Sequence, residues 1–100
     1  MQDDKVKTIA DRILRAHLAS FDYEGVDVRS GYDQDDEPAL FIDAILGANA
    51  PAALGSALID AHYQINKELL ADGEERFPYL FSKRVSGDFP ADVPNARRLA

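Results

Sequence analysis

The residues with the most obvious chemistry form a short acidic run, Asp33-Gln34-Asp35-Asp36-Glu37. Carboxylate oxygens at alternating positions, as at Asp33 and Asp35, are how calcium-binding loops begin. Such a loop needs a glycine at its sixth position and a bidentate glutamate at its twelfth, where this chain has Pro38 and Ala44. We therefore interpret the run as a polar turn between two strands, and we keep Asp33 and Asp35 only as candidate metal ligands.

The two histidines, His17 and His62, offer a second route to a metal ion. Each lies near the apolar stripe of its own predicted helix, so they could approach each other across the helix pair, with Asp60 as a third ligand. Neither helix has a second ligand three or four residues after its histidine, which a preformed site would need. A histidine on the flank of a helix more commonly makes one hydrogen bond than binds a metal ion. We expect no bound metal and no cofactor.

Motifs of catalysis are missing from the chain. None of the serines lies in a Gly-x-Ser-x-Gly turn, and the glycines are scattered singly rather than gathered in a phosphate-binding loop. There is no cysteine to act as a nucleophile, bind zinc or form a disulfide. A working pair of carboxylates needs a cleft between substantial walls, which a chain of this length rarely builds. We expect a protein that is not an enzyme.

Composition and charge describe one small acidic domain. The chain has 100 residues, of which 46% are hydrophobic and 29% charged, near the values of ordinary globular proteins. Its net charge of −7 argues against binding nucleic acid or an anionic membrane, because both need a positive face. The longest uncharged stretch, residues 44–59, contains glycines and a proline and is too short to span a membrane. The polar opening is unlike a secretory signal, so we expect a cytoplasmic protein.

The spacing of apolar residues predicts five elements. They are a helix over 4–19, a strand around 26–30, a strand over 39–46, a helix over about 52–71 and a strand over 77–85. Asp3 or Asp4 is suited to cap the first helix, and Asn49 the second. The order α-β-β-α-β predicts a two-layer α+β domain over residues 1–85, with both helices on one face of a three-stranded sheet. Residues 86–100 are expected to form a loosely ordered tail, and the position of the last strand in the sheet stays open.

The strand over 39–46 is apolar on both sides, which two helices on one face do not explain. One side carries Leu40, Ile42, Ala44 and Leu46. The other side carries Ala39, Phe41, Asp43 and Ile45, where only the aspartate is polar. The last strand likewise has large side chains on both sides, so either Leu80 or the set of Phe77, Tyr79 and Phe81 faces away from the helices.

We therefore predict an apolar patch on the sheet face that the helices leave open. The residues most suited to form it are Phe41, Ile45, Tyr79 and Phe81. A patch of several hundred Å² is about the largest that a soluble monomer exposes, so something is expected to cover it. A second copy of the chain or a different protein is one cover. The other is the tail, which carries Phe89, Val93 and Leu99.

Two resemblances add to this interpretation. In outline, the arrangement resembles a KH-type RNA-binding domain, but it lacks the Gly-x-x-Gly loop and the surplus of lysine and arginine. In sequence, three short motifs resemble landmarks of small uncharacterised acidic bacterial α+β proteins, some of which neighbour toxin-like partners. The motifs are Tyr32-Asp33-x-Asp35, Pro38-Ala39-Leu40 and Arg76-Phe77-Pro78-Tyr79. This resemblance spans residues 21–85 and implies a small partner protein without a reaction, although Asp36 stands where such hairpins more often have glycine.

The leading hypothesis is a protein-interaction module, homodimeric or paired with a basic protein, and antitoxin-like in its most concrete form. The open sheet face would supply the contact area, and the negative charge would steer a positive partner toward it. The competing hypothesis is a regulatory domain that binds a small ligand or a divalent metal ion. It would use His17, His62 and the loop 33–37.

Overall fold

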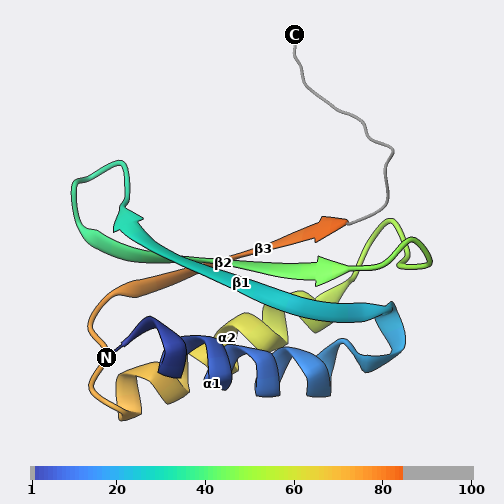
Figure 1. The fold of residues 1–100 in the computed structure, drawn as a ribbon, viewed down its shortest axis with the longest axis horizontal. Coiled ribbons are helices and arrows are strands. Elements are labelled where there is room, and N and C mark those ends of the chain that lie inside the picture. Colours follow the sequence, from blue (N-terminus) through green and yellow to red (C-terminus); the bar gives the residue numbers. More distant parts are fainter. Residues whose placement is uncertain (1, 85–100) are drawn as a thin grey trace, which may run out of the picture.

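The computed structural model describes residues 2–84 of the chain. Its elements follow the predicted order of helix, strand, strand, helix and strand (Figure 1). They are α1 (Asp3–His17), a short 3-10 turn (Ala19–Phe21), β1 (Tyr23–Tyr32), β2 (Pro38–Leu46), α2 (Ser56–Ala71) and β3 (Phe77–Arg84). The tail expected over 86–100 lies outside the described residues. Neither helix in this range is long and apolar enough to cross a membrane.

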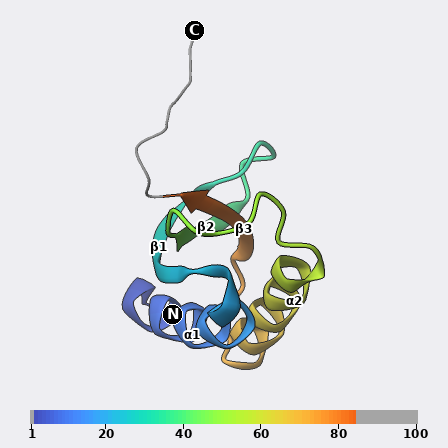
Figure 2. The ribbon, with the colours of Figure 1, turned by 90° about the vertical axis from the view of Figure 1, so that its right-hand side faces the viewer.

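The three strands form one mixed sheet in the order β1-β2-β3. β1 and β2 are antiparallel and joined by a hairpin, whereas β2 and β3 are parallel and joined by α2. The last strand therefore lies beside β2, which answers the question that the sequence left open. Both helices lie on the same face of this sheet (Figures 1 and 2), and the predicted two-layer α+β fold is confirmed.

The hydrophobic core lies between the helix pair and the sheet. β2 supplies its centre, and the four residues predicted to face the helices are all buried: Leu40, Ile42, Ala44 and Leu46. The helices meet them with residues three and four positions apart, namely Val6, Ile9, Ala10, Ile13 and Leu14 of α1 and Ala61, Ile65 and Leu69 of α2. This spacing places one stripe of each helix on the core.

α2 begins at Ser56, later than the predicted start near residue 52. Gly55, the residue directly before it, has φ 61° and ψ −142°, a backbone conformation that a helix cannot contain. The loop before Gly55 is held from the far end of β3, where the Arg84 guanidinium donates hydrogen bonds to the carbonyl oxygens of Ala50 and Pro51.

The predicted helix caps are also wrong. Gln2 is the N-cap residue of α1 and makes no capping bond with its side chain, while Asp3 and Asp4 lie inside the first turn. At these positions their negative charges still interact favourably with the positive end of the helix dipole. Asn49 lies well before α2, and its backbone N–H donates to the Asp22 carboxylate at 2.9 Å.

A buried ion pair joins the turn after α2 to the start of α1. The Glu74 side chain is only 4% exposed and accepts hydrogen bonds from the backbone N–H, Nε and Nη2 of Arg76 at 2.8, 2.9 and 2.8 Å. Arg76 Nη1 also donates to Asp3 Oδ1 at 3.2 Å. Arg76 therefore connects parts of the chain that are 73 residues apart in sequence.

This ion pair predicts a specific dependence of stability on acid. The hydrogen bonds from Arg76 lower the pKa of Glu74 from its ordinary 4.5 to about 2. Glu74 thus stabilises the fold fully above pH 4.5, and the contribution is lost as the pH falls toward 2. We expect Glu74→Gln to reduce the free energy of unfolding at pH 7 by about 3 kcal/mol, because Arg76 loses the buried one of its carboxylate partners. Urea unfolding at pH 7, 5 and 3 measures this.

Between pH 5 and 3, the free energy of unfolding of the variant should also decrease less than that of the wild type. Glu75→Gln is the matched control, since Glu75 is the exposed neighbour, and it should behave as the wild type does. If Glu74→Gln and the wild type lose stability in parallel on acidification, Glu74 is not held by Arg76 as described.

Candidate functional site

The sheet face that lies away from both helices is the candidate site, and we call it the open face. Alternation along the strands, together with the register of the two ladders, places every second residue on this face. Its residues are Gly25, Asp27, Arg29 and Gly31 of β1, Ala39, Phe41, Asp43 and Ile45 of β2, and Phe77, Tyr79, Phe81 and Lys83 of β3. Both helices lie on the opposite face (Figure 1), and among these residues Phe77, at the edge, meets the ring of His62 of α2 edge-on at 5.7 Å.

Aromatic side chains gather at the hairpin end of the open face. Phe41 and Tyr79 are neighbours in register, and their rings stack with centroids 5.7 Å apart and planes 16° apart. Phe77 meets Tyr79 edge-on at 4.8 Å. On the other side of Phe41 lies Gly31, where an added Cβ would come within 3.2 Å of the phenyl ring. The glycine therefore lets Phe41 lie close to β1.

The Arg29 guanidinium extends this row toward β1. Its central carbon lies 5.6 Å from the centroid of the Phe41 ring, the geometry of a cation–π contact. Arg29 Nη2 also donates to Asp43 Oδ2 at 3.3 Å. Sequence reasoning missed Arg29, although its position between Val28 and Ser30 already placed it on the side of β1 opposite the core.

The structure places all four predicted patch residues on the open face, where Phe41 and Tyr79 are in direct contact. Phe81 lies two residues after Tyr79 on β3 and is 49% exposed, whereas Phe41 and Tyr79 are partly buried by each other. Ile45 lies further along β2, beside Lys83 in register, and is separated from the aromatic group by Asp43. The patch is therefore aromatic at one end and aliphatic at the other.

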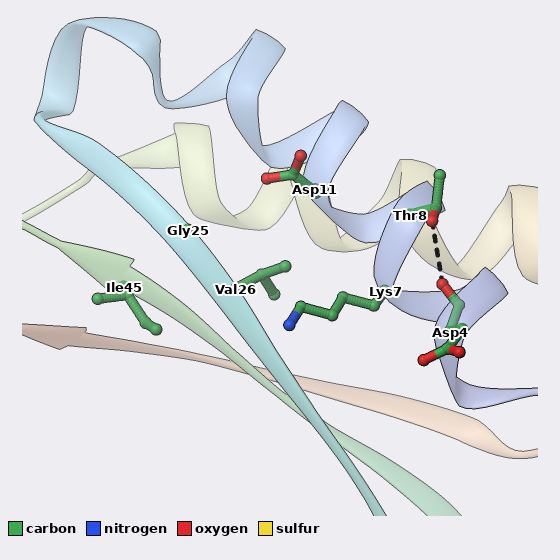
Figure 3. A pocket seen from close by; sticks show the side chains of 7 residues that line it. All are labelled: Asp4, Lys7, Thr8, Asp11, Gly25, Val26 and Ile45. Carbon is green, nitrogen blue, oxygen red and sulfur yellow. Dashed lines mark hydrogen bonds between the residues drawn. The ribbon is translucent and has the colours of Figure 1, made fainter.

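Ile45 also borders a cavity of about 550 Å³ between α1 and β1 (Figure 3). The other residues that line it are Asp4, Lys7, Thr8, Asp11, Gly25 and Val26. Gly25 is the register neighbour of Ile45 and has no side chain to fill this space. Figure 3 shows Lys7 extending from α1 toward Val26 of β1.

The acidic run 33–37 forms the hairpin turn, as the sequence predicted, and one of its carboxylates is fixed in place. Asp33 Oδ1 accepts hydrogen bonds from the backbone N–H groups of Glu37 and Asp35, at 3.1 and 2.9 Å. Asp33 Oδ2 accepts one from the Tyr79 hydroxyl at 3.0 Å. The bond from Glu37 is the main cause that lowers the pKa of Asp33. Tyr79 therefore links the turn to the aromatic group on the open face.

A hollow of about 350 Å³ lies where the turn meets the open face. It is lined by Tyr32, Asp33, Gln34, Phe41 and Tyr79. Three aromatic rings beside a carboxylate form a surface that attracts a positively charged group, since the faces of the rings and the carboxylate are both negative.

The two histidines have separate hydrogen-bond partners. His17 Nε2 donates to Gln64 Oε1 on α2 at 2.8 Å, and His62 Nε2 donates to the Pro78 carbonyl on β3 at 2.6 Å. Asp33, the other main candidate ligand, is held by the turn. Within residues 2–84, no three His, Asp or Glu side chains are placed to hold a metal ion together.

Comparison with known proteins finds no relatives: no family model matches the chain, and neither a curated protein nor a solved structure is significantly similar to it.

The bond between Tyr79 and Asp33 predicts how the tyrosine titrates. This bond is the largest cause that raises the pKa of Tyr79. We expect the pKa of Tyr79 to fall toward its ordinary value of 10.0 in Asp33→Asn, as measured from the pH dependence of its ring signals by NMR. Asp36→Asn is the matched control, because it removes a charge from the same turn without touching Tyr79. An unchanged pKa of Tyr79 in Asp33→Asn would contradict the placement of this hydrogen bond.

Proposed function

We propose that this chain is a protein-binding domain that takes up a basic polypeptide on its open face. The observation that carries the proposal is the uncovered group of Phe41, Tyr79 and Phe81. Both helices lie on the opposite face, Phe81 is 49% exposed, and Phe41 and Tyr79 are half-buried against each other. Contiguous apolar surface of this kind is uncommon on proteins that work alone.

The shape and rigidity of the aromatic group suit a binding surface. Tyrosine, phenylalanine and arginine are enriched at the centres of protein interfaces, where large rigid side chains lose little conformational freedom on binding. Here Arg29, Phe41 and Tyr79 already hold one another in a row before any partner arrives. A prearranged surface of this kind lowers the entropic cost of association.

The charges around the open face favour a positive partner. The face itself is balanced, with Arg29 and Lys83 against Asp27 and Asp43. The acidic excess comes from the turn 33–37, which borders the aromatic end and carries four carboxylates. Together with the net charge of −7, this border attracts lysine and arginine side chains and speeds the encounter with a basic protein.

In its most concrete form, the proposal is a small cytoplasmic protein that masks a basic surface of its partner, as an antitoxin does. Lysine or arginine side chains of the partner would enter the hollow between Tyr32, Phe41 and Tyr79. Their aliphatic stems would lie on the exposed ring of Phe81.

Affinity capture from the native cell with three forms of the chain tests this proposal. The forms are the wild type, Phe81→Asp, and Ala52→Asp as a control that adds the same charge to the exposed loop before α2. We expect a basic protein to be captured by the wild type and by Ala52→Asp, and not by Phe81→Asp. With the purified partner, the Kd should rise about 100-fold in Phe81→Asp, as at a central interface residue.

Circular dichroism serves as the check that all three forms are folded. Capture of the same proteins by the wild type and by Phe81→Asp would overturn the proposal. Recovery of a second copy of the chain alone, lost in Phe81→Asp, would replace the basic partner with self-association through the open face.

A further inference from the structure

α2 carries a second apolar stripe that the core does not use. Ile59, Tyr63 and Leu70 are 70%, 69% and 60% exposed, although α2 buries Ala61, Ile65 and Leu69 against the core. Figure 2 shows α2 at the side of the helix layer, with no described element beyond it. Three large exposed apolar side chains on one stripe of a helix indicate a surface that packs against another element.

The spacing of these residues is that of a helix-pairing seam. Together with Asn66, they lie at intervals of four, three and four residues, which is the alternation of core positions in a coiled coil. We call Ile59, Tyr63, Asn66 and Leu70 the α2 seam. A hollow of about 120 Å³ lined by Leu58, Ile59, His62 and Leu80 continues the apolar surface from the seam to β3.

We propose that the α2 seam pairs with the same seam of a second copy of this chain, with the two helices antiparallel. A twofold axis midway along the seam places Ile59 of one copy opposite Leu70 of the other. The same axis places Tyr63 opposite Asn66, where a phenol and an amide can share a hydrogen bond. The apolar side chains of the two copies therefore face each other, and so do the polar ones. The polar residue in the seam fixes the register of the two helices.

Two charges beside the seam select the antiparallel direction. Asp60 and Lys67 are both exposed, lie along one border of the seam two helical turns apart, and line one hollow together with Tyr63. Within residues 2–84 neither of them makes an ion pair, although the charge of Lys67 acts on the neighbouring Glu68, which is paired with Arg12 of α1. In the antiparallel pair, Asp60 of each copy faces Lys67 of the other. A parallel pair offers neither charge a partner of opposite sign.

The size of the seam predicts a weak and reversible dimer. Burying three side chains of this kind removes roughly 400 Å² from each copy, about half of what a standard interface buries per partner. We therefore expect a Kd on the order of 10 µM. The seam lies on α2 and shares no residue with the open face, so this inference does not rest on the proposed function.

Sedimentation equilibrium of the full chain between 1 and 500 µM tests the inference. The wild type should show a monomer–dimer equilibrium. Leu70→Lys should abolish the dimer, and Asp60→Lys should weaken it about tenfold, because two pairs of opposite charges become pairs of like charges. The double variant Asp60→Lys with Lys67→Asp should restore the wild-type Kd within a few-fold, since both charges are exchanged together.

Phe81→Asp is the control on the other surface and should leave the dimer intact. Circular dichroism and urea unfolding of each variant separate a loss of pairing from a loss of fold. A wild type that stays monomeric at 500 µM overturns the inference. So does a dimer that survives Leu70→Lys, or one that is weakened by Asp60→Lys and not restored in the double variant.

Discussion

Two helices cover one face of a three-stranded sheet, and the rest of the molecule depends on that constraint. Leu40, Ile42, Ala44 and Leu46 lie under the helices, are each at most 2% exposed, and contribute the hydrophobic stabilisation of the sheet. The residues between them on β2 have only their neighbours in the sheet. Phe41 stacks on Tyr79 and lies against Gly31 there, so part of its ring is buried and the rest stays exposed.

The open face keeps its shape because β3 is fastened at both ends. At its start, the pair of Glu74 and Arg76 joins the turn before β3 to Asp3 of α1. At its end, Arg84 holds the loop that follows β2 by two carbonyl groups. These polar contacts lie at the borders of the sheet, where the hydrophobic core ends. Between them, the parallel ladder with β2 sets the register that brings Tyr79 beside Phe41.

The side chains of residues 39–46 were sufficient to predict both faces of β2, because successive residues of a strand point to opposite faces of the sheet. The position of β3 could not be predicted from the sequence, since residues 77–81 are apolar on both sides and only the register decides that Tyr79, not Leu80, lies beside Phe41. The late start of α2 was also missed, because it follows from the non-helical backbone of Gly55 directly before Ser56. The outer stripe of α2 was visible in the spacing of Ile59, Tyr63 and Leu70, but the core stripe alone was enough to explain a helix.

The two surfaces respond in opposite ways to the charge of the chain. The proposed basic partner would be attracted to the acidic border of the open face, and salt would weaken that attraction by screening it. Two copies that each carry a charge of −7 repel each other at long range, and salt weakens that repulsion while the apolar layers of the α2 seam are unaffected. A basic partner on the open face would offset the same negative charge. If both proposals hold, partner binding and pairing through α2 would favour each other by electrostatics alone, without any change of conformation between the two sites.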